Sequence, residues 1–352
     1  MLEDPERPAK RPRSDLDTSS NDDADSLEDL ARDNNFWLVD GTVVLIARKV
    51  AFKVYMGLLA EQSPVFSDVF SSASSNSSKT LDHAPVVHLS DSPEDLRHLL
   101  RALLPNRQRW FVYFCLFSEP FCSQLRNTSL FATRKASPLQ FNQLSALVRL
   151  AHKYQIDDLQ AQAVSALETY FVPDLASLAT RSPAFKAPEG SGIEMIYLAR
   201  LLDMPNLLPF AFYCATFVGG RVANGWSLED GTVRHLEPDD LRRYIDGYGK
   251  LRARAESMLA RIFDIIPQAG ECVDLEDCGD ALEKIYARDI KPLKDDPYLL
   301  RSWKVVKPRE KYGLCRACVG MLETRFKAER AALWNELPSI FDLAVEGWNA
   351  ST

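Results

Sequence analysis

The spacing of hydrophobic and polar positions divides the chain into a short strand-forming region and a longer helical one. Residues 36–39, 42–45 and 52–55 are rich in β-branched and aromatic side chains, which favour strands. Asp40-Gly41 separates the first two runs, and this dipeptide tolerates positive φ at both turn positions. The pattern therefore predicts a tight hairpin centred on Asp40-Gly41, with another strand over residues 86–90.

A serine followed by a proline marks three predicted helix starts, at Ser63-Pro64, Ser92-Pro93 and Ser137-Pro138. The serine oxygen can accept a hydrogen bond from an exposed backbone N–H, and proline is tolerated at the first helical position. The same pairs are compatible with proline-directed phosphorylation. Capping already explains them, so helices are the preferred interpretation, with a further helix starting at about Asp157.

After residue 173 the apolar residues recur almost entirely at helical spacing. Helices are predicted over residues 193–202, from Pro238 onward with Ile245 on the apolar side, and after Cys318, where Pro338 is expected to end the helix. No repeat of 20–50 residues is present, which excludes a kelch propeller.

The order of strands and helices over residues 35–104 and 137–172 resembles the BTB/POZ fold, and its fungal branch most closely. The apolar anchors that carry the resemblance are Phe52, Val54, Leu59, Ala60, Ser63, Phe66 and Phe70. The residues from Ala151 to Leu159 are similar to the family run A-x-K-Y-x-I-x-x-L. The resemblance implies an α/β BTB/POZ domain over 35–172, a small sheet wrapped by helices, followed by a mainly α-helical C-terminal domain over 173–352.

Two departures from the family pattern affect this interpretation. Tyr55 and Met56 replace a common His-Arg pair, so a buried carboxylate at Asp40 would have no basic partner, and Asp40 is instead expected to serve in a turn. This weakens the case for pairing with another BTB chain. The second departure is an atypical insert over 105–136, which contains eight consecutive apolar residues from Trp110 to Phe117.

Two hypotheses explain the insert: an added element that packs on the domain or binds a partner, or a translated retained intron. The second is preferred because the family pattern resumes abruptly near residue 134. Eight apolar residues are too few to span a bilayer, which needs about twenty. A transcript that contains the coding bases for Trp110 to Phe121 would rule out the intron hypothesis.

Composition and charge indicate a disordered tail at the N-terminus. Of the net charge of −7, residues 1–35 carry −6, with eleven acidic and five basic side chains. Residues 1–34 are therefore interpreted as a disordered acidic tail. Its short basic cluster, Lys10-Arg11-Pro12-Arg13, fits a nuclear-import signal or simply a solvated tail. No wider basic surface is evident, so a nucleic-acid partner is not expected.

The sequence shows no signal peptide and no membrane-spanning run, which predicts a cytoplasmic or nuclear protein without a membrane partner. Its seven cysteines are then expected to stay reduced. Four of them form two pairs, Cys272 with Cys278 and Cys315 with Cys318, and 36 residues separate the pairs.

Two cysteine pairs suit a tetrahedral zinc ion, because each pair can point both sulfurs at one metal. With all four ligands from protein, such a zinc would be structural. The fungal proteins that this chain resembles often show similar pairs. The alternative is ordinary buried thiols, and a redox role for Cys315-Cys318 is disfavoured because no thioredoxin-like βαβ pattern surrounds it.

No phosphate loop, nucleophile elbow or H-E-x-x-H motif occurs, so the chain is not expected to be an enzyme. The resemblance implies a protein-interaction module. The leading hypothesis is an adaptor that links a partner to a cullin ubiquitin ligase, and the alternative is a nuclear transcription-associated scaffold. The third hypothesis is an enzyme in the C-terminal half of the chain. The candidate partner-binding residues, which could equally form core, are Val65, Phe66, Val69 and Phe70.

Overall fold

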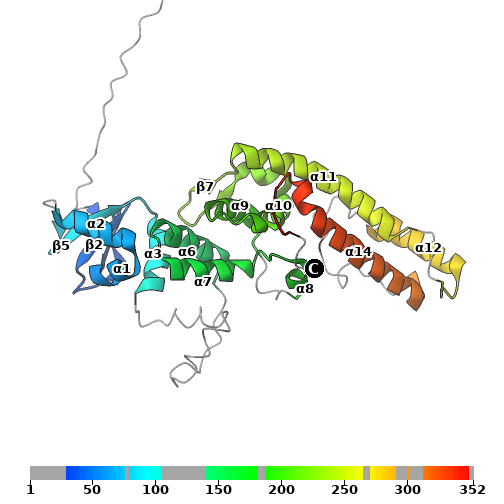
Figure 1. Ribbon diagram of the computed structural model, residues 1–352, viewed down its shortest axis with the longest axis horizontal. Helices are drawn as coiled ribbons and strands as arrows, with labels where there is room; N and C mark the ends of the chain where they lie inside the picture. The colour runs from blue at the N-terminus through cyan, green and yellow to red at the C-terminus, as the bar shows by residue number, and fades with distance from the viewer. Residues whose placement is uncertain are drawn as a thin grey trace, which may run out of the picture.

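The structure is a computed structural model that describes residues 29–75, 79–104, 139–180, 187–264, 270–290, 300 and 312–348. The molecule is elongated, with the sheet at one end and two long helices reaching toward the other (Figure 1). The predicted insert over 105–136 and nearly all of the predicted tail lie outside the described residues. The last four residues of the predicted tail, 31–34, belong instead to the first strand, which begins at Ala31.

A five-stranded sheet forms the N-terminal region. Its strands are β1 (Ala31–Trp37), β2 (Val43–Ala47), β3 (Val50–Val54), β4 (Thr80–Leu81) and β5 (Ala84–Leu89), in the order β1-β3-β2-β5-β4. β2 pairs antiparallel with β3 and parallel with β5, which makes the sheet mixed. Every residue of β2 is buried, so both faces of this central strand are covered.

The predicted hairpin at Asp40-Gly41 is wrong. β1 does not pair with β2; it pairs in parallel with β3, and the tight hairpin joins β2 to β3 through Arg48, whose φ is +52°. Asp40-Gly41 still makes a turn, in which the Gly41 N–H donates to the Leu38 carbonyl at 3.1 Å. Asp40 is exposed there and accepts a hydrogen bond from the Tyr55 hydroxyl at 2.7 Å.

Helices cover the sheet and extend the region. They are α1 (Met56–Gln62), α2 (Pro64–Ser75), α3 (Pro93–Leu103), α6 (Phe141–Lys153) and α7 (Asp157–Glu168). The predicted starts at Pro64, Pro93 and Asp157 are confirmed. Ser63 Oγ accepts the Phe66 N–H at 3.0 Å and Ser92 Oγ accepts the Asp95 N–H at 3.1 Å, as capping requires. Ser137-Pro138 lies outside the described residues.

The C-terminal region is almost entirely helical. Its elements are α8 (Leu175–Thr180), α9 (Ser191–Leu201), η3 (Pro205–Leu207), α10 (Leu208–Ala215), η4 (Thr216–Asn224), β6 (Trp226–Ser227), β7 (Val233–Arg234), α11 (Pro238–Ile262), α12 (Leu275–Ile285), η5 (Tyr286–Ile290) and α14 (Arg316–Ile340). An α/β region followed by a helical one is therefore observed, as the sequence predicts.

Two details of the helix predictions are wrong. α14 runs on to Ile340 instead of stopping before Pro338. This proline lies in the last turn, where a missing donor and a local kink cost less than they do in a helix interior. Ile245 was expected on the apolar side of α11 but is 59% exposed.

α11 and α14 lie side by side and antiparallel, forming what we call the arm (Figure 1). Arg242 of α11 binds Asp342 just after α14, whereas Arg254 binds Glu336 and Arg261 binds Glu329, so the partners run in opposite directions along the two helices. One continuous buried core includes residues from both the sheet region and the arm, so the predicted boundary near residue 173 does not interrupt the core. None of the described helices is long and apolar enough to cross a bilayer.

Candidate metal centre

The first cysteine pair lies at the start of α12. Cys272 is in the loop before this helix, and its Sγ contacts the Asp274 carbonyl at 3.2 Å. Asp274 caps α12 by accepting the backbone N–H groups of Glu276 and Asp277, each at 3.0 Å. The cap fixes the direction in which α12 begins, and Cys278 then lies one turn into the helix with its side chain buried.

The second pair forms the start of α14. Cys315 is the N-cap residue of this helix, and its sulfur accepts the Cys318 backbone N–H at 3.5 Å. Because the N-terminus of a helix carries partial positive charge and unpaired N–H donors, it stabilises a thiolate. The C-x-x-C spacing therefore places both sulfurs at the electropositive end of the helix.

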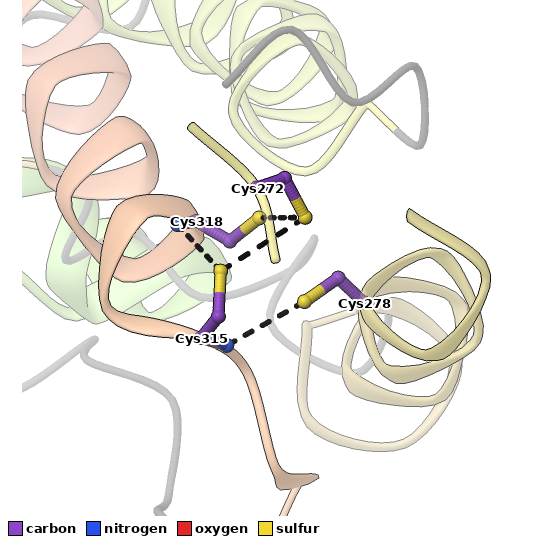
Figure 2. A group of neighbouring side chains, drawn as sticks. All are labelled: Cys272, Cys278, Cys315 and Cys318. Atoms are coloured by element: carbon purple, nitrogen blue, oxygen red, sulfur yellow. Dashed lines mark hydrogen bonds between the residues drawn. The ribbon is translucent and has the colours of Figure 1, made fainter. Parts of the chain in front are cut away.

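The two pairs meet at the distal end of the arm. All four sulfurs lie within 4.8 Å of one another (Figure 2). Cys272 Sγ is 3.5 Å from Cys318 Sγ and 3.9 Å from Cys315 Sγ, and the Cys315 backbone N–H points at Cys278 Sγ at 3.5 Å. The prediction that these four cysteines form one group is thus confirmed. The group draws its members from the loop before α12, from α12 and from the start of α14: Cys272, Cys278, Cys315 and Cys318.

These separations fit a tetrahedral metal. A zinc ion with four bonds of about 2.3 Å to sulfur places its ligand atoms about 3.8 Å apart, close to the distances of 3.5 and 3.9 Å from Cys272 Sγ to the sulfurs of Cys318 and Cys315. The donor set consists of thiols only, which selects soft or borderline metals over Mg²⁺ or Ca²⁺. With four protein ligands, no coordination position would remain for a substrate or a water molecule.

The environment makes the thiols unequal. Hydrogen bonds from the backbone N–H groups of Val273 and Cys318 lower the pKa of Cys315 to about 6, so this sulfur is a thiolate at neutral pH. Burial raises the pKa of Cys278 and of Cys318 above the ordinary thiol value. Four thiolates therefore do not coexist here without a cation, and a bound metal would supply the charge that favours their deprotonation.

The predicted partner-binding residues divide into two kinds. Phe66 is 0% exposed and Phe70 is 3% exposed, and both belong to the core, where the Phe66 ring stacks on Tyr154 with 4.1 Å between centroids. Val65 and Val69 are half-buried and pack against the same core. The two phenylalanines are therefore closed to a partner, and the two valines offer only part of their surface.

A cavity of about 590 Å³ opens on the N-terminal region, between the end of α1, α3 and the starts of α6 and α7. We call it the helix cavity. The apolar side chains that line it include Leu103, Leu147 and Leu159. Its polar lining includes amide side chains such as Gln143 and Gln162. This volume lies in the range of ligand and peptide sites.

The sequence analysis did not find the helix cavity, because its walls come from four helices that are not consecutive in the chain. It also did not find the contacts between the β6–β7 turn and the N-terminal region. There, Glu229 lies 2.7 Å from His98 Nε2 of α3, and Asp230 accepts a hydrogen bond from Arg48 at 2.5 Å.

Comparison with known proteins adds no relative: no family model matches the chain, and neither a curated protein nor a solved structure is similar to it.

Proposed function

We propose that this chain is a non-catalytic adaptor. Its N-terminal region binds one protein, and the helical region, whose arm is held together by a structural zinc ion, binds another. The observation that carries the adaptor proposal is the helix cavity, whose lining combines apolar side chains with amide and charged ones. Apolar contacts supply affinity, and amides can pair with the backbone of an inserted segment, so such a lining suits a protein partner.

The N-terminal domain of a cullin is the partner to test first, because the resemblance of residues 35–104 and 137–172 to BTB/POZ domains supports it. A titration of the full chain against this domain by calorimetry should give saturable binding with a Kd that is micromolar or tighter. A folded chain that fails to bind would remove the cullin hypothesis and leave a scaffold with other partners.

A matched pair of variants localises the binding. Ala102 lines the helix cavity on α3, whereas Ala253 is exposed on α11. Ala102→Arg should fill part of the cavity and weaken binding by about tenfold or more. Ala253→Arg makes the same change on the arm and should leave the Kd unaltered. Equal effects of both variants would place the contact elsewhere.

The zinc proposal rests on a separate observation, the convergence of four sulfurs within 4.8 Å. Such a zinc would tie α12 and the loop before it to the start of α14. It would supply a fixed cross-link and no reaction step, since all four ligands come from the protein. Cys272, Cys278, Cys315 and Cys318 would hold it.

Metal analysis of the purified chain tests the zinc proposal. Mass spectrometry of the metals should find about one zinc per chain, and replacement by Co²⁺ should give the absorption of tetrahedral cobalt with sulfur ligands. Cys278→Ser should lose both signals. Cys214→Ala, a change in α10 away from the centre, should keep them. A metal-free wild-type chain that takes up no cobalt would contradict the proposal.

A further inference from the structure

We infer that the four-cysteine centre is a peroxide-sensitive switch, in which oxidation joins Cys272 to Cys315 as a disulfide and thereby removes two of the four ligands of the metal. This inference rests on the proposed zinc site and adds a means of regulating it. It is carried by three features of the centre: the access to its sulfurs, the backbone that holds each sulfur, and the charge around them.

Access separates the four sulfurs into two groups. Cys272 and Cys315 are partly exposed, whereas Cys278 is 2% and Cys318 is 0% exposed. A small oxidant dissolved in water therefore meets Cys272 or Cys315 first. These two sulfurs are 3.9 Å apart, so the group that reacts has its partner beside it (Figure 2).

The backbone separates them in the same way. Cys278 lies inside α12 and Cys318 inside α14. Cys272 lies in the loop before α12, and Cys315 is an N-cap residue with extended φ and ψ. A disulfide needs the sulfurs about 2.05 Å apart. The required movement falls on a loop residue and on an N-cap residue, and the N-cap residue joins the hydrogen-bond ladder of α14 through its carbonyl oxygen, which accepts the Val319 N–H at 3.1 Å. Cys272 with Cys315 is thus the pair that closes with the least disruption.

Charge decides which oxidant can arrive. Between Arg261 and Lys284 the chain contains seven acidic and no basic side chains. Glu271, Asp274 and Glu276 are exposed next to the cysteines. A zinc ion with four thiolates adds a net charge of about −2. Oxidised glutathione is an anion and is repelled by this surface, whereas hydrogen peroxide is neutral and is not.

The chemistry balances with peroxide as the only oxidant. The Cys315 thiolate, at the N-terminus of α14, attacks one peroxide oxygen; the O–O bond breaks, a sulfenic acid forms and hydroxide leaves, which takes a proton to become water. The Cys272 thiolate then attacks the sulfenic sulfur, the S–S bond forms and a second hydroxide leaves and becomes water. Two thiolates lose two electrons, and one peroxide with two protons becomes two waters. Cys278 and Cys318 alone cannot complete a tetrahedral site.

The test uses the full, zinc-loaded chain and a coloured zinc chelator as the readout. Hydrogen peroxide should release the zinc at least about tenfold faster than the same concentration of oxidised glutathione. Because the chain has seven cysteines, alkylation of the free thiols and peptide mapping must assign the bond, which should join Cys272 to Cys315. A thiol reductant followed by zinc should restore the original state. Cys214→Ala should behave like the wild type.

A charge variant tests the role of the acidic surface. Glu271→Gln combined with Glu276→Gln leaves all four cysteines in place. It should raise the rate of zinc release by oxidised glutathione more than the rate of zinc release by peroxide. A chain that never binds zinc would contradict the zinc proposal itself. A chain that binds zinc but keeps it under peroxide would overturn the switch. So would a chain that forms a Cys272–Cys318 or Cys315–Cys318 bond, or sulfinic acids, instead of the Cys272–Cys315 bond.

Discussion

Arg149 of α6 and Glu194 of α9 form an ion pair inside the core, and the Glu194 side chain has no exposed surface. The carboxylate also accepts hydrogen bonds from Ser145 at 2.6 Å and from Arg234 of β7 at 2.7 Å. The second arm of the Arg149 guanidinium binds Asp95 of α3 at 2.7 Å. A single buried carboxylate thus joins the N-terminal region to the helical one.

Removal of one member of this pair should be strongly destabilising. Arg149→Met leaves Glu194 buried with one cation instead of two, and we expect a loss of about 3–5 kcal/mol in the free energy of unfolding. The double change Arg149→Met with Glu194→Met removes the buried charge as well, and should recover part of this loss. Urea unfolding followed by circular dichroism measures both, and a double variant less stable than Arg149→Met alone would contradict this explanation.

Gly192 of α9 should tolerate no side chain. A Cβ there would lie 2.4 Å from the Ala215 backbone nitrogen and 2.6 Å from the Ala211 carbonyl oxygen of α10. Gly192→Ala must therefore push the two helices apart, at a cost of about 2–4 kcal/mol. Gly249, in α11, has open space around the same position. Gly249→Ala should stabilise the chain by about 0.5–1 kcal/mol, since alanine favours helix. In thermal unfolding, the Tm of Gly192→Ala should fall below that of the wild type and the Tm of Gly249→Ala should rise above it.

Metal removal should loosen the end of the arm. Treatment with a strong chelator should lower the Tm of the wild-type chain by about 5–10 °C. Zinc binds the folded state and not the unfolded one, so its removal takes away the stability that this binding contributes. Cys318→Ser should start from the lower Tm and show no further change with the chelator. The prediction fails if the chelator lowers the Tm of Cys318→Ser as much as that of the wild type.

Asp230 should contribute stability that depends on pH. Burial alone would raise its pKa, but hydrogen bonds from Thr232 and from Arg48 outweigh burial, so the pKa lies below the ordinary value. The contribution is therefore present above the unfolded pKa of about 3.9 and is lost as the pH falls through the lower folded pKa. Asp230→Asn should cost about 1 kcal/mol at pH 7, and the difference from the wild type should shrink toward pH 3.

Asp246 provides the control for this prediction. It pairs with Arg242 on the surface of α11, where both side chains are more than half exposed. Asp246→Asn should change the stability by less than about 0.5 kcal/mol. Urea unfolding at several pH values should separate the two variants, and identical pH profiles would show that the contacts of the Asp230 carboxylate with Thr232 and Arg48 contribute nothing.

Local signals in the sequence predict local structure well. Ser63 and Ser92 cap helices as expected, because a cap depends on residues three positions apart. The failed hairpin at Asp40-Gly41 shows the limit of such signals. The turn forms, but β1 pairs in parallel with β3, and strand pairing depends on residues far apart in the chain.

The candidate site follows the same division. The C-x-x-C spacing of Cys315 and Cys318 predicts a half-site, but their approach to Cys272, more than forty residues earlier in the chain, is a property of the folded molecule. Glu194 was missed because an acidic residue in a short helix is normally placed on its exposed side. A signal existed: Ile193 and Ile196 form one apolar face of the helix, and Met195, Leu198 and Ala199 form another. The helix is therefore apolar on nearly every side, which is typical of a fully buried helix.

The length of the arm has a consequence of its own. α11 and α14 each contain 25 residues, and at about 1.5 Å per residue each extends about 37 Å. The start of α14, where the cysteine group lies, is at the far end of this pair, and the helices that line the helix cavity, α1, α3, α6 and α7, lie beyond its near end (Figure 1). The arm therefore sets the distance between its two ends, and a partner bound at one end would lie at that distance from a partner bound at the other. Adding or deleting one helical turn in both helices would change this distance by about 5.4 Å.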